Sequence, residues 1–69
     1  MTDKVYDIIE VVGTSEKSIE EAIENAVKKS AAKNRKLDWF EIIDTRGFID
    51  NDHVKYYQVH LKIGCSNQN

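Results

Sequence analysis

The stretch HVKYYQVHLKIG, residues 53–64, has the clearest pattern in the chain. From Tyr57 to Ile63 every second position is apolar or aromatic, and these positions are Tyr57, Val59, Leu61 and Ile63. The positions between them are mostly polar, namely Tyr56, Gln58, His60 and Lys62. Because successive side chains of a strand point to opposite faces, this alternation predicts a strand with one face in the core.

The segment before it is expected to pair with this strand. Leu37–Ile49 reads as a strand, and the polar run DNDH at residues 50–53 predicts a tight reversal between the two. An antiparallel hairpin requires the inner faces of both strands to match. Phe40 and Ile42 fit that inner face.

The far face of the same hairpin then receives Trp39, Glu41, Ile43 and Thr45. Trp39 and Phe40 are neighbours, so the two large rings cannot both enter one core. We expect Phe40 inside, and Trp39, which is the only tryptophan, on the side away from the helix. Gln58 and His60 are expected near it.

A helix is predicted after Gly13. Its apolar residues follow the spacing i, i+3, i+4, i+7, i+8, and they are Ile19, Ala22, Ile23, Ala26 and Val27. Thr14 or Ser15 can accept the free N–H groups of the first turn, and SIEE at residues 18–21 offers an alternative capping box. The turn out of the helix is expected at KNRK, residues 33–36.

The first strand is predicted over Lys4–Val12, and apolar residues occupy both of its faces. The expected fold is therefore α+β with the order β-α-β-β, in which a three-stranded antiparallel sheet packs on one amphipathic helix. Residues 1–69 form a single domain, with residues 65–69 as a short polar tail. The second apolar face of the first strand is expected to meet a partner subunit.

Composition favours an oligomer. A chain of 69 residues buries only about 60% of its unfolded surface, so its core alone is marginal. Its single cysteine, Cys65, excludes an internal disulfide, and no His/Cys cluster has the spacing of a zinc site. Oligomerisation is the remaining common route to stability for so small a domain.

The net charge and the N-terminal residues limit the classes of binding partner and the cellular location that we expect. A net charge of -2 gives no electrostatic footprint for nucleic acid. The start MTDKVYDIIE lacks the apolar run of a signal peptide, and no segment is predicted to span a membrane. The expected location is the cytoplasm.

Several motifs in order resemble the dodecin family of small flavin-binding proteins. They are VGTSEKSIEEAIENAV, LDWFEI, RG and YYQVHLKIG, and the resemblance extends from about Lys4 to Gly64. It implies a homododecamer of β-α-β-β subunits that binds flavins in pairs at two-fold contacts. It also implies that symmetry-related copies of Trp39 sandwich the flavin rings.

The resemblance further implies a set of ligand contacts. Gln58 would meet the donor and acceptor edge of the flavin ring, because an amide offers both. Arg46 would lie near the phosphate of FMN, and Lys4 and Tyr6 would stand on the phosphate side as well. FMN is thus the expected cofactor, with riboflavin or other flavins as alternatives.

The implied activity is binding and buffering of flavin with quenching of its photochemistry, and no catalytic constellation is evident. Dodecins have also been linked to coenzyme A, although no residue here argues for that ligand. The chain departs from the family after Gly64, where it reads CSNQN. The contribution of this tail to an assembly is therefore left open.

Two other functions stay open at this point. Trp39 could fill a subunit contact in a purely structural oligomer, because tryptophan is enriched at interfaces. Aromatic side chains on a sheet can also bind single-stranded RNA. The acidic charge balance and the single tryptophan on the far face argue against RNA.

Overall fold

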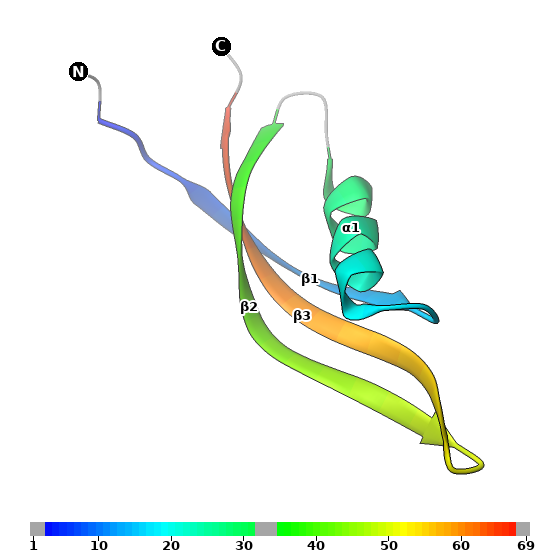
Figure 1. Ribbon diagram of the computed structural model, residues 1–69. Helices are drawn as coiled ribbons and strands as arrows, with labels where there is room; N and C mark the ends of the chain where they lie inside the picture. Colours follow the sequence, from blue (N-terminus) through cyan, green and yellow to red (C-terminus); the bar gives the residue numbers. More distant parts are fainter. Residues whose placement is uncertain (1–2, 32–34, 68–69) are drawn as a thin grey trace.

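The computed structural model describes residues 3–31 and 35–67. The chain forms strand β1 (Asp7–Ser15), helix α1 (Ile19–Ser30), strand β2 (Arg35–Asp50) and strand β3 (His53–Asn67). The three strands form one antiparallel sheet in the order β1-β3-β2, and α1 covers one face of it (Figure 1). This is the α+β arrangement predicted from the sequence. β1 begins at Asp7 and runs to Ser15, so the predicted bounds Lys4–Val12 were wrong at both ends.

The β2–β3 hairpin turns where the polar run predicted it. Asn51 and Asp52 have positive φ angles of 57° and 66°, and Asp50 pairs with His53. Asn and Asp tolerate this left-handed conformation better than most residues, and two such residues suit the twist of a hairpin. Of the predicted turn at KNRK, Arg35 and Lys36 already belong to β2, and the first two residues lie outside the described part of the chain.

Helix α1 begins at the alternative capping box. The Ser18 Oγ accepts a hydrogen bond of 3.0 Å from the backbone N–H of Glu21. Ser15 is not the cap, since it ends β1, and its hydroxyl donates to Glu21 Oε1 at 2.6 Å. Both serines therefore hold the first turn of the helix against the end of β1.

The core lies between α1 and the inner face of the sheet, which is the face toward the helix. Its buried members are Ala22, Ala26, Val59, Leu61 and Ile63. Gly13 allows the close approach, because a Cβ there would overlap the carbonyl oxygen of Ala22. The alternation in residues 53–64 thus identified the buried face of β3.

Phe40 and Ile42 lie on this inner face but outside the core. They pair with Ile63 and Leu61, yet they remain 48% and 45% exposed. The prediction that Phe40 enters the core was therefore wrong. The reason is the placement of α1, which packs on β1 and β3 and leaves β2 uncovered (Figure 1).

A β-bulge at Ile43 reverses the faces of the second half of β2. Ile42 pairs with Leu61 and Asp44 pairs with His60, so two steps on β2 match one step on β3. Thr45 consequently lies opposite the buried Val59 on the inner face, not on the far face as predicted.

Residues 65–67 belong to strand β3 and are not a tail. β3 continues to Asn67, and Cys65 pairs with Asp7 on one side and Leu37 on the other. Cys65 is only 1% exposed, and its Sγ donates to the backbone carbonyl oxygen of Asp7 at 3.4 Å. The expectation that a polar tail begins at residue 65 was therefore wrong.

The molecule is elongated for its size. Its radius of gyration is 14.4 Å, whereas a compact chain of this length has a value of about 11 Å. The turn end of the hairpin projects beyond α1 (Figure 1). On β1, Ile8 and Val12 are each 55% exposed on the face away from the helix. These exposed apolar side chains are suited to contact with another chain.

Candidate functional site

Trp39 lies on the outer face of the sheet, which is the face away from α1. It pairs with Gly64, and a Cβ at Gly64 would overlap the indole ring. The ring therefore rests directly on the backbone of β3. Trp39 is still 39% exposed, so part of the indole is available to another molecule.

Two further candidates come from the segment before β1. The ring of Tyr6 meets the indole of Trp39 edge to face, with centroids 5.9 Å apart and planes at 67°. Such a T-shaped contact is a favoured geometry for aromatic pairs. Lys4 is exposed two residues earlier. The structure thus brings Tyr6 and Trp39 together at one end of the outer face.

Gln58 and Arg46 lie at the other end of that face. They pair with each other across β3 and β2, and Thr14 of β1 flanks Gln58 on its other side. Gln58 precedes Gly64 by six residues, which corresponds to roughly 20 Å along a strand. Gln58 and His60 share the outer face with Trp39, as expected, although Gln58 does not lie beside Trp39 within one chain.

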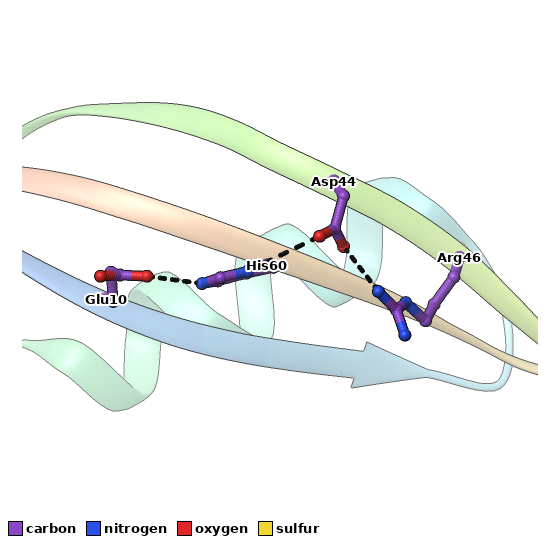
Figure 2. Close-up of polar contacts among 4 residues, drawn as sticks. All are labelled: Glu10, Asp44, Arg46 and His60. Carbon is purple, nitrogen blue, oxygen red and sulfur yellow. Dashed lines mark hydrogen bonds and ion pairs between the residues drawn. The ribbon is translucent and has the colours of Figure 1, made fainter.

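A polar network crosses the outer face between these ends (Figure 2). His60 Nε2 lies 2.7 Å from Glu10 Oε2, and His60 Nδ1 lies 3.7 Å from Asp44 Oδ2. Arg46 Nη2 lies 3.6 Å from Asp44 Oδ1. Each of the three strands contributes to this network.

Sequence reasoning missed Glu10, Asp44 and His60 as a group. Simple alternation along β2 places Asp44 and Arg46 on the same face as Ile42, and only the bulge at Ile43 brings them to the outer face. A polar histidine within a regular strand was the one available signal. It did not indicate its partners on the other strands.

The chain by itself offers little enclosure at Trp39. The cavity of about 110 Å³ that Trp39 helps to line lies on the helix side of the sheet, because its other walls are Val27, Leu37, Asp38, Phe40 and Ile63. Pockets for small molecules usually have volumes of about 300–1,000 Å³. A flat ligand at Trp39 would therefore lie on a surface that one chain leaves open.

Within residues 3–31 and 35–67, no group of three or more His, Cys, Asp or Glu side chains is arranged to hold a metal ion. In the same described segments, no helix is long and apolar enough to cross a membrane.

The fold and the outer face together define a class of small β-α-β-β protein with exposed aromatic and cationic groups on its open sheet face. A family model described as Dodecin matches residues 5–67. Dodecin from Thermus thermophilus is 48% identical over 61 residues, which is 88% of each chain. The chain belongs to the dodecin family.

Solved structures agree with this assignment. Dodecin from Streptomyces coelicolor has a TM-score of 0.85 at 40% identity, covering 100% of this chain and 97% of that one. A variant of Thermus thermophilus dodecin, in which a tryptophan is replaced by phenylalanine, has a TM-score of 0.80 at 39% identity. That alignment covers 97% of this chain and 98% of the variant.

Proposed function

We propose that this protein binds FMN on the outer face of its sheet and stores it within a homododecamer. The observation that carries the proposal is the position of Trp39, which rests on Gly64 and is partly exposed. A rigid indole fixed in this way offers a large contact area at little cost in conformational entropy. The indole of Trp39 therefore suits stacking against a flat aromatic ligand such as the flavin ring.

A second chain would complete the site. Trp39 lies at one end of the outer face, and Gln58 lies at the other, so one flavin ring cannot meet both within a single chain. A two-fold axis near the middle of this face would bring Trp39 of one chain toward Gln58 of another. The exposed Ile8 and Val12 and the elongated shape support such an association.

The polar groups suit FMN in particular. The Gln58 amide can donate to a flavin carbonyl and accept from a flavin N–H. Arg46 is 58% exposed in its side chain and can hold phosphate oxygens with two parallel N–H groups. Lys4 would add positive charge, and Tyr6 would support the indole. Riboflavin, which lacks the phosphate, would bind through the ring alone.

The role would be storage and buffering in the cytoplasm, without catalytic turnover. When bound, the flavin ring supplies light absorption and redox chemistry. Trp39 would quench the excited ring by giving an electron that afterwards returns to the indole. None of the candidate groups is arranged as a nucleophile with an adjacent base.

The direct test uses the single tryptophan as its own reporter. The ligand-free protein is sized on a column and then titrated with FMN, while indole and flavin emission are followed together. We expect both emissions to fall to one saturating endpoint on a particle much larger than a monomer. Unchanged indole emission after correction for absorbance would contradict stacking at Trp39.

A pair of variants separates binding from assembly. Trp39→Ala is expected to weaken FMN binding by about 10- to 100-fold, as for loss of one stacking ring, while the particle keeps its size. Phe40→Leu is the matched control, because Phe40 is the neighbouring ring on the opposite face. If Trp39→Ala instead dissociates the particle and Phe40→Leu does not, Trp39 is a structural contact.

A further inference from the structure

Asp44 lies between two cationic or potentially cationic groups. One of its carboxylate oxygens, Oδ1, is 3.6 Å from Arg46 Nη2, and the other, Oδ2, is 3.7 Å from His60 Nδ1 (Figure 2). His60 Nε2 is held at 2.7 Å by Glu10. The charge of His60 therefore affects the carboxylate of Asp44, and this carboxylate in turn affects the Arg46 guanidinium.

The charged surroundings of His60 come from all three strands. β1 contributes Glu10, and β3 itself contributes Lys62 two residues away. β2 contributes Glu41, Asp44 and Arg46. Helix α1 lies on the opposite face of the sheet. With neutral His60, three carboxylates face two cations, so this part of the outer face is negatively charged.

We propose that His60 is a positioning residue that makes the preference for FMN over riboflavin depend on pH, by offsetting the negative charge of Asp44, the carboxylate that also pairs with Arg46. The inference rests on the proposed function, in which Arg46 binds the phosphate of FMN. It assigns a role to three residues, Glu10, Asp44 and His60, that would not themselves touch the flavin ring.

The direction follows from the donors on the imidazole. Neutral His60 has one N–H, which the short contact assigns to Glu10, and its Nδ1 then has no proton for Asp44. Asp44 then pairs with Arg46 alone, and its negative charge repels a nearby phosphate. Protonated His60 donates from both nitrogens, so it engages Asp44 and cancels the local negative charge. Arg46 can then bind phosphate with less repulsion from Asp44.

The comparison is made between pH 8 and pH 6, because histidine is the side chain that ordinarily changes charge within the physiological pH range. All members of the network are open to solvent, with side-chain exposures of 30% to 58%. Exposed ion pairs change affinities only modestly. We therefore expect the ratio of FMN affinity to riboflavin affinity to rise by about two- to fivefold at pH 6.

The phosphate of FMN also titrates near pH 6, so a matched variant is needed. The experiment measures FMN and riboflavin affinity by quenching of flavin emission at pH 6 and pH 8, in the wild-type assembly and in His60→Gln. Gln keeps a donor for Glu10 but cannot become charged. For each protein, the ratio of FMN affinity to riboflavin affinity at pH 6 is divided by the same ratio at pH 8. We expect this quotient to be about two- to fivefold larger in the wild type than in His60→Gln. Superimposable pH profiles would overturn the proposal.

Asp44→Asn tests the connection between His60 and Arg46. It frees Arg46 at every pH, so the FMN preference at pH 8 should rise about two- to fivefold and the His60-dependent gain should vanish. Retention of the full gain in Asp44→Asn would overturn the proposal, since His60 would then act on the phosphate directly. An unchanged preference at pH 8 would overturn it as well.

Riboflavin distinguishes this inference from the proposed function. If wild-type protein binds neither flavin at either pH, the proposed function fails and the inference falls with it. If both flavins bind and the His60→Gln profile matches the wild type, only the inference fails. Particle size at both pH values shows that each variant remains assembled.

Discussion

The two faces of β3 differ in how much of their structure one chain completes. On the inner face, Leu61 and Val59 are fully buried under α1, at 0% exposure. On the outer face, the neighbouring His60 and Gln58 remain partly open. The same strand therefore stabilises the fold with one set of side chains and presents the other set for binding. One chain therefore buries the inner face of β3 by itself, whereas the proposed ligand site on the outer face needs a second copy.

The largest expected effect tests the inner face. Leu61→Ala removes a fully buried side chain and should lower the free energy of unfolding by about 2–5 kcal/mol. Ile42→Ala is its control, because Ile42 pairs with Leu61 on the same face but is 45% exposed. Denaturant unfolding measures both. An equal loss in Ile42→Ala would break the comparison, since it would mean that another chain buries Ile42.

The next effect concerns the outer face. Gly64→Ala places a methyl group where the indole of Trp39 now lies, so the ring must move. We expect flavin affinity to fall about tenfold, equivalent to about 1.4 kcal/mol. Titration of flavin emission measures it.

Gly47→Ala is the matched control for Gly64→Ala. A Cβ at Gly47 meets only the Tyr56 carbonyl oxygen at 3.8 Å, an ordinary contact. Its flavin affinity should stay within about twofold of the wild type, as expected for a surface substitution. Equal losses in the two glycine variants would mean that the position of the indole does not control binding.

A smaller effect tests the junction between β1 and α1. Ser18→Ala removes the N-cap acceptor of Glu21 N–H and should lower stability by about 1 kcal/mol. Thr14→Ala, at the end of β1, should change stability by about 0.5 kcal/mol or less. Thermal unfolding of both variants checks this. A larger loss in Thr14→Ala would contradict the assignment of the cap.

The smallest effect concerns the phosphate end of the outer face. Arg46→Gln should lower FMN affinity about three- to fivefold, because an exposed cation contributes modestly, and it should leave riboflavin affinity nearly unchanged. Added salt should narrow the gap between the two flavins in the wild type. Lys36→Gln, a substitution of an exposed cation on β2, is the charge control. Equal effects on both flavins would contradict phosphate binding by Arg46.

Much of the inner face could be read from the residues. The alternation in residues 53–64 identified Val59, Leu61 and Ile63 as core, and the 3.6-residue spacing identified Ala22 and Ala26 as their partners. The exposure of Phe40 could not be read in this way. The exposure of Phe40 depends on where α1 lies over the sheet, and the pattern of apolar residues in β2 does not indicate that position.

The sequence by itself determined the order of the elements, a tight reversal at residues 50–53 and the placement of Trp39 away from the helix. These follow from periodicity and from turn residues, which act locally along the chain. Only the tertiary structure decided that Asp44 and Arg46 share the outer face with His60, through the bulge at Ile43. It also decided that Trp39 and Gln58 lie at opposite ends of that face. A bulge depends on how two strands pair, so the alternation of either strand alone cannot reveal it.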